Sequence, residues 1–490
     1  MFFNTVDFVI FLIVVGTTIT IIKNRSFQHL FLLAASYFFF YYSSNYLIIL
    51  LLFTTIWDFY LGKMIHSAKT IQQKKALLIL CVGVNLGILG FFKYADFAIM
   101  QFNFLGKEFN IANEIPLLFL TLPIAISFYT FHSVGYIVDV YRGTVAPCKS
   151  LRDYAIFIAF FPQLVSGPIL RAGHFLPQLR EKFETAQAGS KLYLIIINNK
   201  NLKIALTMIA FGLLKKMFFA DNIAPLVNDV FANVIGKGSL EIWLATIAFG
   251  IQIYCDFSGY TDIALGIAIM LGFKIPINFN KPYFATSPSD FWRRWHISLS
   301  TWLRDYLYVP LGGNRKSNAR TYANLITVMF LGGLWHGASW NFVIWGLLHG
   351  AYLSGQKMIL NKFPSLQNNS FFKTKIGKIF SILVTQYFVF LAWIPFRVEN
   401  INEVSYSMQK FIFLDLDLHL FTNFVSSHKF PALLVLLFLV LHFISYRKGN
   451  IISSISELKM KYWVLMIGGT VFCILFFINS NPEDFIYFRF

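Results

Sequence analysis

Repeated apolar stretches, each about as long as a bilayer is thick, constrain this chain more than any other feature. They include residues 6–22, 117–138, 243–271 and 376–395. A transmembrane helix needs about 20 mostly apolar residues. Hydrophobic residues make up 57% of the chain and charged residues only 13%. A soluble core could not bury so many such stretches, so we predict an all-α polytopic membrane protein: a single membrane domain over residues 1–490, with the lipid bilayer as a permanent partner.

The basic residues gather between the apolar stretches. The chain has 41 Lys and Arg against 23 Asp and Glu, a net charge of +18. Cytoplasmic loops of membrane proteins carry an excess of Lys and Arg, which places the loops at residues 23–25, 63–75 and 274–320 inside and both termini outside. The N-terminal apolar run has no preceding basic region and no cleavage signature, so we expect it to be retained as the first span. No stretch resembles a nucleic-acid-binding module.

Residues 321–354 form an apolar stretch of unusual length. A helix of 34 residues would exceed the bilayer core of about 30 Å, and basic residues flank both of its ends. We therefore predict a broken helix pair or re-entrant hairpin that turns near Gly332, Gly333, His336 and Gly337.

His336 is the first candidate for chemistry. An ionisable side chain inside the membrane indicates a functional site by default. On a continuous helix, Ser339 and Trp340 would share its face. A neutral imidazole can take a proton from a hydroxyl or a thiol, or accept an acyl group itself. A buried histidine that only hydrogen-bonds a carbonyl group explains the pattern equally well at this point.

A second candidate is the cytoplasmic run at residues 290–306, in which aromatic and basic residues alternate. This pattern predicts an interfacial helix with a cationic face that attracts either anionic lipid or a phosphate-bearing cofactor. His296 lies in this run, 40 residues before His336, and spacing alone does not show whether the two meet. The basic and aromatic candidates of this run are Trp292, Arg293, Arg294 and Arg304.

Two carboxylates lie within the apolar stretch at residues 243–271. Ser258 and Asp262 share a helical face, whereas Asp256 points elsewhere. We expect both carboxylates to face the bundle interior, paired with arginines or polar backbone. No metal site is predicted, because the histidines show no HxxxH or HExxH spacing and no CxxC pair occurs. The four cysteines are widely separated and indicate no disulfide framework: Cys81, Cys148, Cys255 and Cys473.

Six ordered motifs resemble those of the membrane-bound O-acyltransferases. The chain is most similar to the bacterial alginate and peptidoglycan O-acetyltransferase membrane subunits, with the teichoic acid D-alanine transfer protein as a cousin. The motifs, whose core spans about residues 120–355, are residues 122–131, 161–169, 256–264, 290–302, 334–341 and 485–490.

The resemblance implies a ring of about 11 transmembrane helices, with re-entrant and interfacial helices around a central funnel open to the cytoplasm. It makes His336 the essential histidine and His296 the second polar position. It also makes Tyr487 a possible acyl relay, beside Arg489, where relatives often have a neutral polar residue. The expected supporting residues are Trp335, Ser339, Trp340 and Asn341, together with the basic run and Asp256, Ser258 and Asp262.

The resemblance further implies a reaction. Cytoplasmic acetyl-CoA is the expected donor substrate, with no permanently bound cofactor. The acceptor is expected to be a periplasmic or extracellular partner with a serine esterase-like, SGNH-type fold, which passes acetyl to a polysaccharide outside a bacterial cytoplasmic (inner) membrane. Two alternatives remain: a proton or solute transporter that uses Asp256, Asp262 and His336, and an assembly scaffold without chemistry.

Overall fold

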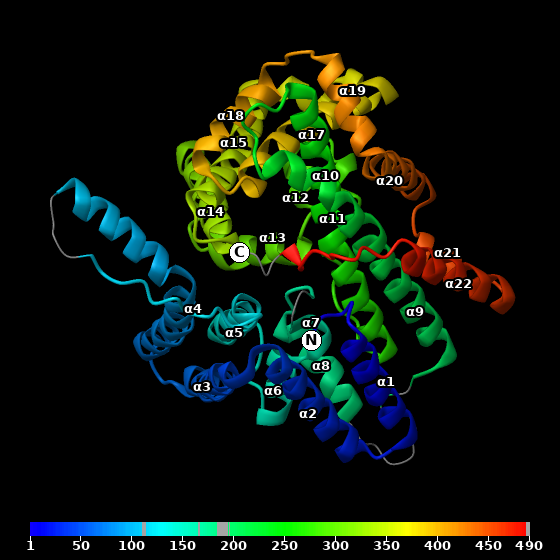
Figure 1. Ribbon diagram of the computed structural model, residues 1–490. Coiled ribbons are helices and arrows are strands. Elements are labelled where there is room, and N and C mark those ends of the chain that lie inside the picture. Colours follow the sequence, from blue (N-terminus) through cyan, green and yellow to red (C-terminus); the bar gives the residue numbers. More distant parts are fainter. Residues whose placement is uncertain (110–113, 165–166, 184–194, 196, 487–490) are drawn as a thin grey trace. The chain divides into compact units, whose positions relative to one another are not determined.

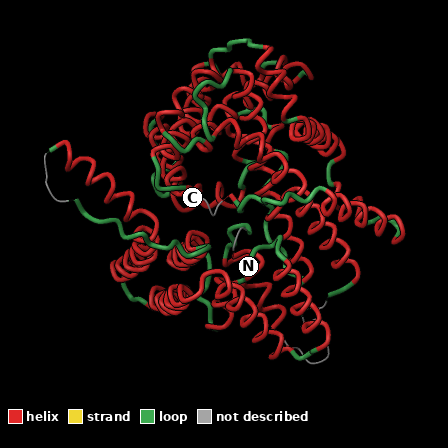
Figure 2. Tube along the Cα trace, in the orientation of Figure 1, coloured by secondary structure: helices red, strands yellow, loops and turns green. Residues whose placement is uncertain are grey.

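The computed structural model describes residues 1–109, 114–164, 167–183, 195 and 197–486. Within those ranges the chain is built of helices and connecting loops, with no strand (Figures 1 and 2). It divides into two compact units. The first comprises Met1–Leu206 and Ile263–Pro276, and the second comprises Thr207–Asp262 and Ile277–Phe490.

The first unit contains the N-terminal helices. They are α1 (Val6–Ile21), α2 (Arg25–Ser44), η1 (Asn45–Leu47), α3 (Ile48–Ser67), α4 (Ile71–Glu108), α5 (Ile126–Arg142), α6 (Leu151–Ala159), α7 (Phe161–Leu164), α8 (Ala172–Phe183) and the N-terminal half of α9 (Asn199–Leu213), together with the C-terminal end of α11 (Ser239–Met270).

Buried contacts join four helices of the first unit. Asp58 of α3 accepts hydrogen bonds from Cys81 Sγ at 3.0 Å and Asn85 Nδ2 at 2.7 Å, both on α4. On α5, the Tyr136 ring packs against Gly62 of α3 and at a tilted angle against Tyr154 of α6. Hydrogen bonds are needed here because a buried carboxylate without partners is costly.

The second unit contains the remaining helices. They are η2 (Leu214–Ala220), α10 (Asp221–Phe231), most of α11 (Ser239–Met270), η3 (Pro282–Phe284), α12 (Pro288–Trp292), α13 (Ile297–Leu303), η4 (Arg304–Tyr308), α14 (Asn318–His336), α15 (Trp340–Lys362), η5 (Pro364–Asn368), α16 (Ser370–Lys373), α17 (Lys375–Arg397), α18 (Ile401–Ile412), α19 (Leu418–Ser427), α20 (Lys429–Lys448), α21 (Ile451–Ser456) and α22 (Met460–Phe476). The stretches η2 and η4 are π-helical.

Hydroxyl side chains start the helices that form the centre of this unit. Ser317 Oγ accepts from the backbone N–H of Arg320 at 3.2 Å at the start of α14, and Thr374 Oγ1 accepts from Gly377 at 3.0 Å at the start of α17. Such caps satisfy N–H groups that have no partner inside the helix. Helix α15 then packs against both α14 and α17.

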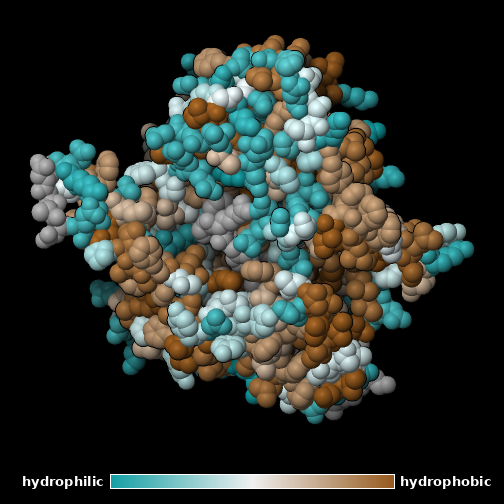
Figure 3. All heavy atoms as spheres, viewed as in Figure 1, coloured by the Kyte–Doolittle hydropathy of each residue, from teal (hydrophilic) through white to brown (hydrophobic). Residues whose placement is uncertain are grey.

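Five helical segments of the described chain are long and apolar enough to cross a membrane: Arg25–Ser67, Ile71–Glu108, Ser239–Met270, Lys375–Arg397 and Lys429–Lys448. Two shorter apolar helices are α1 and α22. Apolar side chains gather over α20 and α22 in Figure 3. The exposed apolar residues of these two helices include Leu436, Leu465 and Phe472. An all-α, multi-pass membrane protein is therefore confirmed, whereas a ring of eleven spans remains a prediction.

Candidate active site

The site is built on an antiparallel pair of helices, α14 and α15. Helix α14 ends at His336, Gly337 is extended with φ −166° and ψ 154°, and Ser339 caps α15 by accepting from the backbone N–H of Asn341 at 3.3 Å. The predicted broken helix pair is confirmed. Its break lies at Gly337, one of the four residues named for the turn, and α14 continues without a break through Gly332 and Gly333.

Glycines let the two helices approach to backbone contact. A Cβ atom on Gly333 of α14 would lie 2.2 Å from the carbonyl oxygen of Phe342, and one on Gly346 of α15 would lie 2.4 Å from that of Met329. Real Cβ atoms do not come within 3.0 Å of a neighbour. Gly333 therefore serves the packing of the pair and does not turn the chain.

His336 lies in a cage of aromatic rings at the closed end of this pair. Its side chain is buried. The ring centroids of Trp335 and Trp345 each lie 4.9 Å from the imidazole, and that of Phe396 on α17 lies 5.1 Å away. The expectation that Ser339 and Trp340 share a helical face with His336 is wrong, because α14 ends at His336 and Trp340 is half exposed. The indoles that hold the imidazole are Trp335 and Trp345.

His296 belongs to the same aromatic cluster. It is buried, adopts a left-handed backbone with φ 42°, and precedes α13. Its ring centroid lies 5.9 Å from that of Trp335 and 4.7 Å from that of Phe257 on α11. His296 and His336, 40 residues apart in the sequence, thus pack against the same indole. The single interfacial helix expected over residues 290–306 is wrong, because the left-handed turn at His296 separates α12 from α13.

His349 is a member of the cluster that the motifs did not identify. Its Nδ1 atom accepts a hydrogen bond from Trp292 Nε1 at 3.3 Å, and its centroid lies 4.8 Å from that of Trp345. A row of rings therefore runs from Trp292 through His349 and Trp345 to His336. The sequence does indicate that His349 and Trp345 share a helical face, since they are four residues apart on one helix. The apolar residues around them give no further indication of a site.

A basic cavity of about 530 Å³ lies beside one end of this row. Arg293, Arg304 and Lys357 line it together with Trp292, and none of its lining side chains is acidic. A hydrogen bond from Arg304 Nε to the Asp305 carboxylate raises the pKa of Arg304, so this residue stays charged. Arg294 lies outside the cavity lining and pairs with Asp290 at 2.9 Å.

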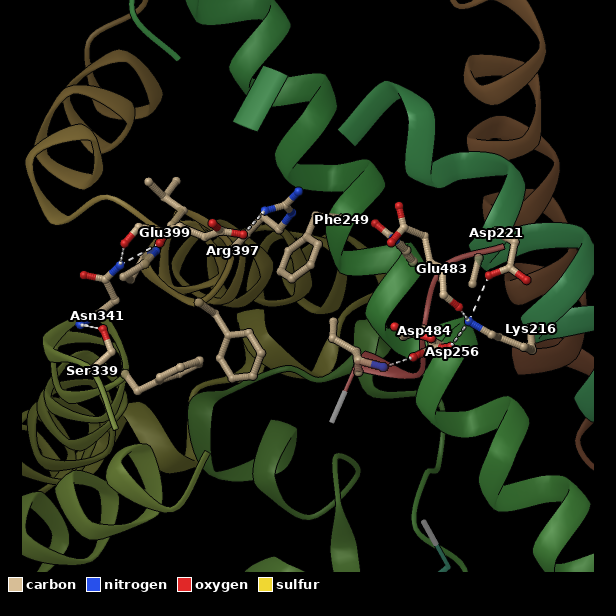
Figure 4. A pocket seen from close by; sticks show the side chains of 17 residues that line it. Lys216, Asp221, Phe249, Asp256, Ser339, Asn341, Arg397, Glu399, Glu483 and Asp484 are labelled. Carbon is tan, nitrogen blue, oxygen red and sulfur yellow. Dashed lines mark hydrogen bonds and ion pairs between the residues drawn. The ribbon is translucent and has the colours of Figure 1, made fainter. Parts of the chain in front are cut away.

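A second, acidic cavity of about 260 Å³ lies beside the closed end of the helix pair (Figure 4). Ser339, Asn341 and Phe342 line it from the helix pair. The charged residues in its wall are Lys216, Arg397, Asp221, Asp256, Glu399, Glu483 and Asp484. Asn341 donates through Nδ2 to the carbonyl oxygens of Val398 at 2.6 Å and Glu399 at 2.9 Å, which fixes the end of α17 beside the cavity.

The carboxylates of α11 pair with two adjacent lysines of η2. Lys215 Nζ lies 2.6 Å from Asp262, and Lys216 Nζ lies 2.8 Å from Asp256. The expected arginine partners are wrong, because lysines take their place; the expected backbone partner is found for Asp256, which accepts from the N–H of Ile486. Ser258 is buried on α11, and neither it nor Asp262 lines the two cavities.

The predicted relay residue, Tyr487, lies outside the described residues. The segment before it is described: Phe485 packs on Tyr260 with a centroid distance of 4.2 Å, and the backbone N–H of Ile486 donates to Asp256 Oδ2 at 2.8 Å. Within the described ranges, no group of three or more His, Cys, Asp or Glu side chains could hold a metal ion.

Comparison with known proteins links this arrangement to a family. The sequence profile of the membrane-bound O-acyltransferase family matches residues 148–394. This chain is 39% identical to a probable alginate O-acetylase of Azotobacter vinelandii over 71% of its own length and 65% of the relative's. It is 37% identical to a peptidoglycan O-acetyltransferase of Helicobacter pylori, over 71% of the chain and 66% of the relative.

A more distant match is a teichoic acid D-alanyltransferase of Bacillus subtilis, 28% identical over 57% of the chain and 74% of the relative. The family profile covers residues 290–306, the α14–α15 pair and α17 as far as Ile394; Phe396 of the aromatic cluster lies two residues beyond its end. The chain belongs to the membrane-bound O-acyltransferase family.

Proposed function

We propose that this protein transfers acetyl groups from cytoplasmic acetyl-CoA toward an extracytoplasmic polysaccharide, with His336 as the reacting side chain. The observation that carries the proposal is the position of His336 on the α14–α15 pair. Met329 of this pair lines the basic cavity, and Phe342 lines the acidic cavity. His336 follows Met329 by seven residues, about 10 Å along the helix axis, and its ring packs near that of Phe342.

The basic cavity suits a donor that carries phosphate groups. Arginine and lysine form charge-assisted hydrogen bonds with phosphate, and a lining without acidic side chains does not repel one. Trp292 offers an aromatic face at the same place. Acetyl-CoA combines phosphates with a thioester arm, and it would act as a substrate and not as a resident cofactor.

The imidazole of His336 can catalyse the transfer as a general base. It would accept the proton of an acceptor hydroxyl while that oxygen attacks the thioester carbonyl. Collapse of the tetrahedral intermediate would break the carbon–sulfur bond, and the departing thiolate would take the proton from the imidazolium. Direct attack by the imidazole, with a transient acetyl-imidazole, is the alternative route. His296, which packs against the same Trp335 indole as His336, would help to position the donor.

The acceptor side is proposed from the relatives. Two of them are named for the acetylation of alginate and of peptidoglycan. We propose a polysaccharide of this class, reached through a partner with a serine esterase-like fold outside the cytoplasmic membrane of a bacterium. Tyr487 would be the relay between His336 and that partner.

Transport is the weaker alternative. It needs intramembrane carboxylates that can exchange protons or ions. Asp256 and Asp262 are instead held in ion pairs with Lys216 and Lys215. Solute flux in the absence of acetyl-CoA would favour transport. A scaffold without chemistry would tolerate replacement of both His296 and His336.

The test is acetyl-CoA consumption by purified protein with its acceptor. His336→Gln is expected to lower the rate at least 10²-fold, as is typical when a general base is lost. The matched control is His442→Gln, because His442 is also buried among aromatic rings but lies on α20. A His336→Gln protein that folds normally and retains activity would overturn the proposal.

A further inference from the structure

The ammonium group of Lys216 has a hydrogen-bond acceptor for each of its three N–H groups. One of these acceptors belongs to the C-terminal segment, residues 477–486. Its Nζ atom lies 2.9 Å from Asp221 Oδ1, 2.8 Å from Asp256 Oδ1 and 2.7 Å from the carbonyl oxygen of Glu483 (Figure 4). A lysine has three N–H donors. Two carboxylates and one main-chain carbonyl therefore account for all three.

Other side chains fasten the same segment, residues 477–486, to η2, α10 and α11. Asn222 Nδ2 donates to the carbonyl oxygen of Phe477 at 2.9 Å, and Asn479 Nδ2 donates to that of Asp221 at 2.7 Å. Asn228 Nδ2 donates to Glu483 Oε1 at 2.6 Å. The backbone N–H of Ile486 donates to Asp256, whose other oxygen contacts Lys216.

These hydrogen bonds satisfy backbone groups of the segment that would be paired within a helix if the segment were helical. The chain leaves α22 at Phe476 and continues as irregular backbone up to Ile486. Buried backbone N–H and C=O groups need hydrogen-bond partners, which here come from side chains of other elements. The buried Lys216 sits on a π-helical stretch, a rare conformation that is frequent at functional sites.

The fastened segment forms one wall of the acidic cavity. Glu483, Asp484 and Ile486 line it, together with Asn341 and Phe342 of the helix pair. The position of the segment therefore sets the shape of the space next to the His336 cage.

We propose that Lys216 is a positioning residue that clasps the C-terminal segment between Asp221 and Asp256 and thereby sets the shape of the acceptor side of the site. This inference rests on the proposed function, because it assigns the acidic cavity to the acceptor. It predicts that loss of the clasp raises the KM for the acceptor and leaves the KM for acetyl-CoA unchanged.

The first experiment measures how tightly the C-terminal segment is held, through the rate of cysteine labelling and without an activity assay. Ile486 is 7% exposed, so Ile486→Cys in a Cys473→Ser background should react slowly with a membrane-impermeant maleimide; the other three cysteines are buried. Adding Lys216→Met is expected to speed labelling about tenfold, the ratio that corresponds to the loss of one hydrogen bond to a charged group. Lys216→Arg, which keeps the charge, should restore slow labelling in part.

Lys215→Met is the matched control, since Lys215 also pairs with an aspartate of α11 but contacts no residue of the segment through that pair. Its labelling rate should stay within about twofold of the parent, below the effect of one such hydrogen bond. Equal labelling of the Lys216→Met and Lys215→Met proteins would overturn the inference.

A second variant covers the case in which Lys216→Met does not fold because two aspartates lose their partner. Asn228→Ala removes the donor to Glu483 Oε1 and leaves the Lys216 ion pairs in place. It should also speed labelling, by a smaller factor, and unchanged labelling would count against the clasp. If the parent shows no acetyl transfer, the proposed function fails while the labelling result still decides the inference.

Discussion

Gly333→Ala tests how closely the α14–α15 packing controls the position of His336. The new Cβ atom would lie 2.2 Å from the carbonyl oxygen of Phe342, where 3.0 Å is the practical minimum, so the helices must separate by about 0.8 Å. The obstacle is backbone and cannot swing aside. Overpacking of this kind costs about 1–3 kcal/mol, and a misplacement of about 1 Å in an active site can lower the rate about 10²-fold.

The assay combines thermal unfolding in detergent with the rate of acetyl-CoA consumption. Gly333→Ala should lower both the Tm and the rate. Gly355→Ala is the matched control, because Gly355 lies on α15 and its Cβ would meet nothing within 4 Å. Alanine is favoured over glycine inside a helix by about 0.5–1 kcal/mol, so this control should keep its rate and hold or raise its Tm. If Gly333→Ala matches Gly355→Ala in both measurements, the packing argument is refuted.

Two further predictions concern the charged groups. Arg293→Ala and Lys357→Ala should each raise the KM for acetyl-CoA about tenfold by removing a charged hydrogen-bond donor from the basic cavity; an unchanged KM, equal to that of the exposed control Lys373→Ala, would contradict the donor assignment. Hydrogen bonds from Lys410 and Ser239 hold the pKa of Asp415 below its usual range. A carboxyl group whose pKa is lower in the folded than in the unfolded protein stabilises the fold at pH values above its unfolded-state pKa, about 3.9 for Asp. Asp415→Asn should therefore lower the Tm at pH 6, and the difference in Tm from the parent should shrink as the pH falls below about 4. A difference in Tm that does not depend on pH would contradict this.

The sequence predicted the helices better than the contacts between them. Apolar length and basic flanks were enough to predict a broken helix pair around His336, because bilayer thickness limits a straight helix. The glycines placed the break within residues 332–337 but did not single out Gly337. Gly333 resembles a turn residue in the sequence, but its role is a close approach to the carbonyl of Phe342.

The composition of the site depends on contacts between distant residues. Phe257, Trp335 and Phe396 lie far apart in the chain and meet around the two histidines, and no local pattern encodes such a meeting. The left-handed turn at His296 was also not predictable, because a histidine and not a glycine adopts the positive φ. Likewise, Lys216 and Glu483 lie 267 residues apart in the sequence, and only the fold brings them together.

The central claim is that acetyl passes from a donor on the cytoplasmic side, through His336, to an acceptor on the other side. Its most direct test is the protein in sealed vesicles, with acetyl-labelled CoA supplied on one side and the acceptor partner on the other. We expect label on the acceptor only when the donor is on the face of the basic cavity, and loss of that label in His336→Gln but not in His442→Gln. Label that reaches the acceptor equally well in His336→Gln vesicles would contradict the account.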